Sequence, residues 1–264
     1  MSTSVPAGSL RPTRVLTAPL ADGLGAVTVE DRDHTRPYLL LHGGGGPATM
    51  TGFADLLAQR THSRVLTPTH PGFAGTPHVP GVTSTRDLAA AYVGMLGELG
   101  LSDVTVIGNS FGGWLAAEIA LLDSPRVSGA VIVDGIGIEV EGHPMTSIAG
   151  FTPAEVQKLS FHDPRKAPPA AGGKGLSPDI QALISYTGPT MSDPSLLQRL
   201  STLGHFPVHV VWGESDGIVS PAYGKAYASA IPLSKFTPLP RTGHLPQVET
   251  PEELLGALLD LGVN

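Results

Sequence analysis

The sequence of 264 residues predicts an α/β fold in which a mostly parallel sheet carries helices on both faces. Short apolar segments alternate with amphipathic helical segments, which is the pattern of repeated strand–helix–strand units. Residues 38–41 are apolar at every position, as is typical of a strand covered on both faces. In such sheets the functional residues gather at the carboxyl ends of the strands.

The first half of the chain predicts a hairpin followed by strand–helix units. Residues 15–20 and 26–30 form the expected hairpin, because Asp22-Gly23 between them is typical of a tight turn. Further strands are expected at residues 38–41, 64–68, 104–107 and 127–133, and helices at residues 50–60, from Ser84 and from residue 111.

The pattern changes between residues 139 and 206, where no clear strand is predicted. Helices are expected after the cap-plus-proline pairs Thr152-Pro153, Ser177-Pro178 and Asp193-Pro194, and the Pro/Ala/Gly-rich residues 166–175 predict a mobile connector. Strands at residues 208–212 and 235–239 and helices from Ser220 and Thr250 resume the sheet. We therefore expect a core of residues 13–138 and 207–264, an inserted helical subdomain of residues 139–206, and a flexible tail of residues 1–12.

The composition restricts the classes of partner. The chain carries 16 Lys and Arg against 23 Asp and Glu, a net charge of −7, so we expect no nucleic-acid partner. It has no cysteine, which excludes disulfides and thiolate metal sites. No apolar run reaches membrane-spanning length and residues 1–12 lack the apolar core of a signal peptide, so we expect a cytoplasmic protein.

The motif Gly-x-Ser-x-Gly at residues 108–112 predicts a nucleophilic serine. It follows an apolar strand and a helical pattern starts immediately after it, so Ser110 is expected on a sharp, strained turn at the sheet edge. A second match at residues 213–217 also follows an apolar segment, but no helical pattern starts directly after Ser215. We therefore expect Ser110 to be the nucleophile.

A serine hydroxyl needs a base, and the base needs a carboxylate to orient it. His244 lies in the loop after the last predicted strand and is the expected base. Asp216 follows the strand at residues 208–212 and is the expected acid. Asp134, after the strand that follows the serine, is the main alternative for the acid, and Glu214 is a minor one.

An acyl-transfer site also needs backbone donors for the developing oxyanion. The N–H of Phe111, at the start of the helix, is one candidate. Gly44, and then Gly43, from the four glycines after His42, are the candidates for the second donor. The motifs that bind nucleotide phosphates through a glycine-rich loop do not occur here. We expect neither a metal nor an organic cofactor.

Taken together, these motifs resemble the α/β-hydrolase fold superfamily over residues 13–264. The resemblance rests on His42-Gly43-Gly44-Gly45, on residues 108–113 and 212–216, and on Gly243-His244, in the order Ser, Asp, His. It implies an eight-stranded sheet, with residues 139–206 as a helical cap over the active site. His70 stands where relatives often have Asp, at a position that is usually structural.

The expected reaction is hydrolysis of a small, largely apolar carboxylic ester through an acyl-Ser110 intermediate. Apolar side chains of residues 139–206 are candidates for a substrate pocket, although packing of the cap onto the core explains most of them equally well: Met145, Phe151, Phe161, Tyr186 and Met191.

Three alternatives stay open. The glycines after His42 and the Gly-Asn-Ser of residues 108–110 also resemble hydrolases that cleave carbon–carbon bonds of diketone-like substrates, but Leu245 stands where those relatives often have Trp. Acyl transfer to an acceptor other than water uses the same residues. A ligand-binding sensor that keeps the triad is a hypothesis of another class.

Overall fold

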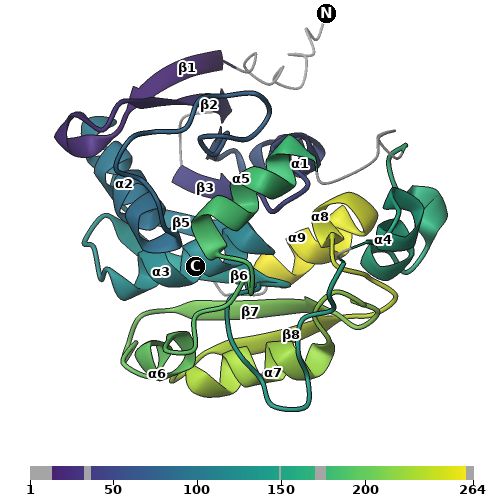
Figure 1. Ribbon diagram of the computed structural model, residues 1–264. Helices are drawn as coiled ribbons and strands as arrows, with labels where there is room; N and C mark the ends of the chain where they lie inside the picture. The colour runs from purple at the N-terminus through teal and green to yellow at the C-terminus, as the bar shows by residue number, and fades with distance from the viewer. Residues whose placement is uncertain (1–13, 33–36, 149, 170–176, 260–264) are drawn as a thin grey trace, which may run out of the picture.

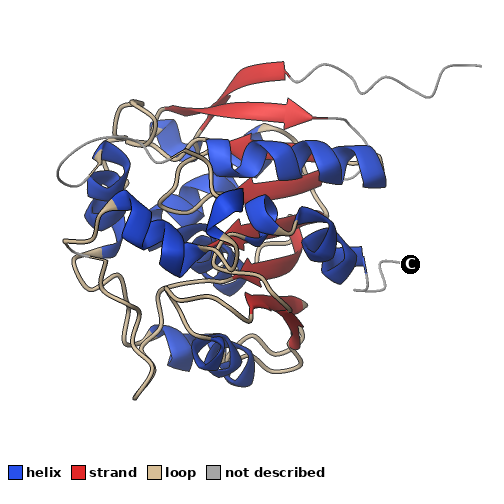
Figure 2. Cartoon of the chain, turned by 90° about the vertical axis from the view of Figure 1, so that its right-hand side faces the viewer, coloured by secondary structure: helices blue, strands red, loops and turns tan. Residues whose placement is uncertain are grey.

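The computed structural model describes residues 14–32, 37–148, 150–169 and 177–259. These residues form one eight-stranded sheet with the order β1-β2-β4-β3-β5-β6-β7-β8 (Figures 1 and 2). The strands are β1 (Arg14–Pro19), β2 (Ala26–Arg32), β3 (Pro37–Leu41), β4 (Arg64–Pro68), β5 (Val104–Asn109), β6 (Val127–Val133), β7 (Val208–Gly213) and β8 (Lys235–Leu239).

The sheet is parallel from β4 to β8 and antiparallel at the edge that β1 and β2 form. The hairpin of β1 and β2 pairs Arg14 with Asp31 and Pro19 with Ala26, which confirms the predicted hairpin. The parallel strands place their carboxyl ends at one edge. The residues that directly follow β3, β5, β6, β7 and β8 therefore meet there.

The helices cover both faces of the sheet (Figure 1). They are α1 (Ala48–Thr61), α2 (Thr85–Glu98), α3 (Phe111–Leu121), α4 (Pro153–Ser160), α5 (Pro178–Thr187), α6 (Leu196–Leu200), α7 (Pro221–Ala230), α8 (Pro246–Glu249) and α9 (Pro251–Leu259). Helices α2, α3 and α7 contribute to the larger apolar cluster, whereas α1 and α9 contribute to the smaller one on the opposite face.

Alternate residues of the central strands enter the two apolar clusters. In β3, Leu39 and Leu41 pack in the larger cluster, while Tyr38 and Leu40 pack in the smaller one. Successive side chains of a strand point to opposite faces, so a strand covered on both sides must be apolar at every position. This is the physical reason for the unbroken apolar segment at residues 38–41.

Between β6 and β7 the described residues form α4, α5, α6 and one short 3-10 turn (Pro164–Lys166), with no named strand. Thr152 caps α4 with the predicted capping box, because its side chain accepts from the N–H of Glu155 and the Glu155 carboxylate accepts from the N–H of Thr152. Ser177 caps α5 with its side chain alone, since its hydroxyl oxygen accepts a hydrogen bond from the N–H of Ile180. The third predicted helix is shorter than expected, since α6 starts only at Leu196.

Some predictions lie outside the described residues: the flexible tail of residues 1–12 and most of the connector at residues 166–175. Within the described chain, none of the helices has both the length and the apolar character needed to cross a bilayer.

Candidate active site

Ser110 lies on a sharp turn between β5 and α3. Its backbone has φ 57° and ψ −115°, an unusual conformation for a residue with a side chain. A Cβ on Gly108 would collide with the carbonyl oxygen of Gly112, and one on Gly112 would collide with that of Leu41. The two glycines of the motif are therefore required by the close approach of the backbone.

His244 and Asp216 form a buried pair at the same edge of the sheet. Asp216 lies in the loop after β7, and its Oδ2 accepts a hydrogen bond of 2.7 Å from His244 Nδ1. The other carboxylate oxygen, Oδ1, accepts from the backbone N–H groups of Ile218 (2.8 Å) and Val219 (3.0 Å). Asp216 is thus fixed by three donors, and it leaves the Nε2 atom of His244 available for a proton.

The residue before the serine joins the two parts of the site. The side-chain amide of Asn109 donates to the carbonyl oxygen of His244 at 2.8 Å, and its Oδ1 accepts from Gln247 Nε2 at 3.0 Å. Among the described residues no hydrogen bond joins Ser110 Oγ to the His244 ring. Such contacts are often long before substrate binds. The bond from Asn109 to the His244 backbone ties the loop of His244 to the residue next to Ser110.

The glycine loop after β3 runs directly beside Ser110. A Cβ on Gly43 would lie 2.8 Å from Ser110 Cβ and 3.3 Å from Ser110 Oγ. Within the described chain, no hydrogen bond engages the backbone N–H groups of Gly43, Gly44 or Phe111. Unpaired amides next to a serine are what an oxyanion requires.

Two buried histidines support this loop from below. His42 Nε2 accepts from the backbone N–H of His70 (3.1 Å), so its Nδ1 carries the proton and donates to the carbonyl oxygen of Gly43 (2.8 Å). His70 Nε2 donates to the carbonyl oxygen of His42 (3.0 Å), and its Nδ1 accepts from the Tyr92 hydroxyl (2.6 Å). Each ring is therefore neutral and has one fixed tautomer.

Burial lowers the pKa of His42 to about 4, despite the opposing hydrogen bond to Gly43. The pKa of His70 is also held well below its usual value, first by burial and then by the neighbouring His42 ring. The ring centroids lie 3.8 Å apart. The two histidines therefore act as structural polar groups rather than as proton carriers.

A further carboxyl group lies against the acid of the pair. Asp134 follows β6, is fully buried, and accepts from the backbone N–H of Gly213 through Oδ1 at 2.8 Å. One side-chain atom of Asp134, one of Asp216 and one ring nitrogen of His244 lie within 4.8 Å of one another. The Nδ1–H of His244 donates to Asp216, whereas Asp134 accepts from Gly213 at the end of β7.

The second Gly-x-Ser-x-Gly match has a different environment. Ser215 lies in a turn after β7 and not at a strand–helix junction, and its hydroxyl pairs with His162 Nδ1 at 2.9 Å. Glu214 in the same turn is exposed. Neither residue makes a hydrogen bond to His244 in the described structure.

The sequence profile of the alpha/beta hydrolase family matches residues 38–257, a span that includes all the residues described above. The chain belongs to the alpha/beta hydrolase family.

The relatives of this alpha/beta hydrolase have several activities. The sn-1-specific diacylglycerol lipase ABHD11 of Mus musculus is 24% identical over 258 residues, with 86% of this chain and 81% of the relative covered. A 2-hydroxymuconate semialdehyde hydrolase of Pseudomonas putida is 30% identical over 133 residues, but this covers only 48% of this chain and 46% of the relative. Among solved structures, a thermophilic esterase from Thermogutta terrifontis matches with a TM-score of 0.73 and 22% identity, covering 94% of this chain and 97% of the esterase. The last comparison confirms the fold.

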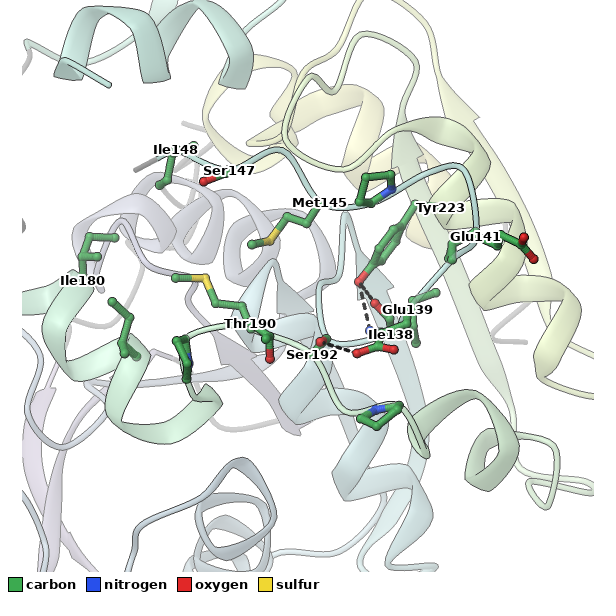
Figure 3. Close-up of a pocket in the computed structure, with 16 residues that line it drawn as sticks. Ile138, Glu139, Glu141, Met145, Ser147, Ile148, Ile180, Thr190, Ser192 and Tyr223 are labelled. Atoms are coloured by element: carbon green, nitrogen blue, oxygen red, sulfur yellow. Dashed lines mark hydrogen bonds between the residues drawn. The ribbon is translucent and has the colours of Figure 1, made fainter. Parts of the chain in front are cut away.

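The described part of this hydrolase has a cavity of about 900 Å³ between the segment after β6 and the region of α5 (Figure 3). Ile180 of α5 lines this cavity and also lies over the glycine loop, since a Cβ on Gly44 would come 3.3 Å from Ile180 Cδ1. The cavity therefore adjoins the loop beside Ser110. Two carboxylates, Glu139 and Glu141, line the described cavity, and no Lys, Arg or His lines it.

The five apolar residues suggested for the pocket fall into different environments. Met145 and Met191 line the cavity. Tyr186 and Phe161 are buried but are not among the lining residues, and Tyr186 donates to the carbonyl oxygen of Pro71 and stacks on Phe111. Phe151 is 44% exposed. The part that each of them has in substrate binding stays a prediction.

Sequence reasoning missed the role of Glu249 in α8. This buried carboxylate accepts from the backbone N–H of Gly243 (2.7 Å), next to the histidine, and from those of His162 and Asp163 after α4 (3.1 and 2.7 Å). The neighbouring His244 N–H donates to the carbonyl oxygen of Ser160 at 2.8 Å. In the sequence, Glu249 is recognisable only as an acidic residue shortly after a proline. Many exposed residues share that pattern, so it does not predict a buried carboxylate.

Proposed function

We propose that this alpha/beta hydrolase cleaves small, largely apolar carboxylic esters through an acyl-Ser110 intermediate, with residues 139–206 as a cap over the site. The observation that carries the proposal is the meeting of three features. These are Ser110 on a strained turn, the buried His244–Asp216 pair, and unpaired backbone amides in the adjacent glycine loop.

In the proposed reaction, His244 Nε2 takes the proton of the Ser110 hydroxyl while the oxygen attacks the ester carbonyl carbon. The oxyanion of the tetrahedral intermediate accepts hydrogen bonds from the N–H groups of Phe111 and Gly44. The intermediate collapses to the acyl-enzyme, and the leaving alkoxide takes the proton back from His244. Water then repeats the sequence and releases the carboxylic acid.

Asp216 keeps the imidazole in the tautomer that this sequence of steps needs. Because its Oδ2 binds the Nδ1 proton, the lone pair of the neutral ring stays on Nε2. The same carboxylate stabilises the imidazolium that forms after the first proton transfer.

The cavity next to the glycine loop supports an ester over an anionic substrate. Most of its lining side chains are apolar, including Ile138, Met145, Ile180 and Met191, and the charged ones are acidic. A muconate derivative is a carboxylate, and a carboxylate binds best to a site with Arg or Lys. No such residue lines the described cavity.

Carbon–carbon bond hydrolysis is the second candidate, because the relative from Pseudomonas putida acts on 2-hydroxymuconate semialdehyde. The same three residues would serve that reaction. The distinction between the two reactions depends on the substrate that the cavity accepts.

A series of nitrophenyl esters with lengthening acyl chains, with 2-hydroxymuconate semialdehyde as the comparison substrate, tests the proposal. We expect ester turnover in the wild type, none above background in Ser110→Ala, and little change in Ser215→Ala, the matched serine of the second motif. A fluorophosphonate probe should label the wild type and Ser215→Ala but not Ser110→Ala. Two results would contradict the proposal: failure of the folded wild type to react with the probe, or faster turnover of 2-hydroxymuconate semialdehyde than of every ester.

A further inference from the structure

One carboxyl oxygen of Asp134 is buried without a hydrogen-bond partner among the described residues. Its side chain is fully buried at the carboxyl end of β6, and Oδ1 accepts from the N–H of Gly213 at 2.8 Å. Oδ2 is buried and has no hydrogen-bond partner among the described residues. A buried polar oxygen without a partner is costly, and in native structures it normally has an explanation.

An ionisable group close to Asp134 is the carboxyl group of Asp216, the proposed acid of the triad. Asp216 and Asp134 each have an oxygen in the group of atoms that lie within 4.8 Å of one another and of a His244 nitrogen. Two carboxylates that share one buried site cannot both be ionised at neutral pH. One proton between them removes the repulsion, and it also turns the unpaired oxygen of Asp134 into a donor.

The hydrogen bonds show which of the two carboxyls holds the proton. Asp216 accepts from the N–H groups of Ile218 and Val219 and from His244 Nδ1, and three donors stabilise a negative charge. Asp134 accepts from Gly213 alone. In agreement with this, burial and then the nearby charge of Asp216 raise the pKa of Asp134 well above its usual range.

We propose that Asp134 is a positioning residue of this site: its carboxyl is neutral at physiological pH and donates its proton to the Asp216 carboxylate. Asp134 thus acts through Asp216, on which it sets both the orientation and the effective negative charge that faces His244. The inference rests on the proposed role of the Ser110–His244–Asp216 triad, but not on the identity of the ester.

The other elements packed against β6 bring no competing charge to this position in the described structure. β5 ends in the neutral residue Asn109, and the neutral Ser110 follows it. Glu118 of α3 is held by Arg199 through two hydrogen bonds of 2.6 Å. The ionisable groups that face Asp134 are therefore Asp216 from the loop after β7 and His244 from the loop after β8.

The local backbone determines which variants are informative. Asp134 has φ 45°, in the left-handed region that Asn and Gly tolerate best. Asp134→Asn keeps an acceptor for Gly213 and a neutral donor for Asp216. Asp134→Gly keeps the backbone conformation but removes the whole carboxyl. Glu214→Gln removes an exposed charge from the same loop as Asp216 and serves as the matched control.

Carbon-13 NMR of aspartate-labelled protein tests the protonation directly. We expect the carboxyl carbon of Asp134 to keep the chemical shift of a protonated acid at pH 7 in the wild type. A carboxyl carbon that titrates near pH 4, as in an ordinary Asp, would overturn the proposal, and this measurement needs no variant.

The titration midpoint of the His244 imidazole, followed by NMR, tests the effect on the triad. In Asp134→Gly the Asp216 carboxylate loses a donor and holds the imidazolium more tightly, so we expect the midpoint to rise by about one unit. Asp134→Asn and Glu214→Gln should leave it within a few tenths of a unit. The acid limb of kcat/KM against pH should move with the NMR midpoint, and Asp134→Asn should recover most of the activity that Asp134→Gly loses.

Two outcomes would overturn the proposal. A lower midpoint in Asp134→Asn would mean that the substitution removed a negative charge, so that Asp134 is ionised. An unchanged midpoint in Asp134→Gly would mean that Asp134 serves only the turn after β6. Because both readouts are independent of substrate, they separate this proposal from the proposed function: an inactive protein with the expected midpoints would contradict only the latter.

Discussion

Asp216 orients His244 through a 2.7 Å hydrogen bond, while two backbone N–H groups hold the carboxylate itself. Asp216→Asn would place an amide N–H or a weaker acceptor opposite Nδ1 and so favour the wrong tautomer. We expect turnover of a nitrophenyl ester to fall by about 10³- to 10⁴-fold with the fold unchanged. Steady-state kinetics together with the thermal unfolding midpoint check this.

Glu214→Gln is the control for Asp216→Asn, since Glu214 is exposed in the same turn and makes no bond to His244. It should keep kcat/KM within about twofold, as expected of a surface charge. Equal losses in the two variants would show that the loop needs negative charge in general, and not Asp216 in particular.

Gly43 lies against Ser110, the proposed nucleophile, and this contact leads to a second prediction at the residue scale. A Cβ at position 43 would come 2.8 Å from Ser110 Cβ and 3.1 Å from the carbonyl oxygen of Asn109, so either the serine or the glycine loop must move. Because a shift of about 1 Å in a reacting group can cost on the order of 100-fold, Gly43→Ala should lower kcat by one to two orders of magnitude. Kinetics with the same ester series measures it.

Gly52→Ala is the matched control, because Gly52 is exposed in α1 and no atom lies within 4 Å of the position of its Cβ. Alanine is favoured over glycine inside a helix by about 1 kcal/mol, so Gly52→Ala should raise the stability while kcat stays unchanged. A loss of activity there would show that the assay responds to glycine replacement in general.

At the scale of elements, an ion pair between a buried carboxylate and a partly exposed arginine joins α6 to α3. Glu118 of α3 is 3% exposed, and its carboxylate binds Arg199 of α6 through two hydrogen bonds of 2.6 Å. Arg199→Leu would leave this buried carboxylate with one hydrogen-bond donor in the described structure, the indole N–H of Trp114, and with a more distant ion pair of 4.0 Å to Arg86. Since Arg199 is partly exposed, we expect a loss of about 2 kcal/mol of stability, below the range for a fully buried pair.

Urea unfolding of Arg199→Leu and of Arg60→Leu provides the measurement. Arg60 forms an ion pair of 2.7 Å with Glu252, but both side chains are more than half exposed, so its replacement should cost less than about 1 kcal/mol. A similar loss in both variants would contradict the idea that burial of Glu118 makes the difference.

The element boundaries also show how much the sequence predicts about the packing. The capping box at Thr152 and the cap at Ser177 correctly place the starts of α4 and α5, because both signals are local. The prediction for Asp193-Pro194 was less accurate, since Asp193 accepts from Ser195, Arg86 and Arg199 and so belongs to an ionic cluster between elements. Contacts between distant elements leave no local signal.

At the scale of the whole molecule, the two buried histidines make folding depend on pH. Both have a pKa below the unfolded value of 6.5, in the case of His42 about 4. Below pH 6.5 the unfolded chain therefore binds protons that the folded chain does not, so these groups destabilise the fold as the pH falls. For His42 the loss amounts to about 3 kcal/mol between pH 6.5 and 4.

Urea unfolding at pH 7 and pH 4.5 tests this, with His70→Asn as the variant and His143→Asn, at an exposed position, as the control. The raised pKa of Asp134 acts in the opposite direction over the same range, but it is common to all three proteins. His70→Asn should show a weaker dependence of stability on pH than the wild type, whereas His143→Asn should match the wild type. Equal slopes in all three would contradict the prediction.

The sequence alone predicts the mostly parallel sheet and the loops that carry Ser110, Asp216 and His244. Apolar segments indicate the strands, and parallel strands bring their carboxyl ends to one edge of the sheet. It does not predict that Glu249 binds Gly243 and the residues after α4, or that a carboxyl oxygen of Asp134 lies within 4.8 Å of one of Asp216. These depend on the exact packing of side chains from separate elements, for which sequence spacing carries no information.

The link through Glu249 restricts how a substrate reaches Ser110. The end of α4 accepts hydrogen bonds from the loops that carry His244 and Asp216, through the carbonyl oxygen of Ser160 from His244 N–H and through that of Leu159 from Gly217 N–H. If α4 moved away from the core to admit substrate, these hydrogen bonds would break, and His244 and Asp216 would no longer be held in place. We expect substrate to enter instead on the α5 side, where the apolar side chain of Ile180 lies over Gly44 and makes no hydrogen bond to either loop in the described structure.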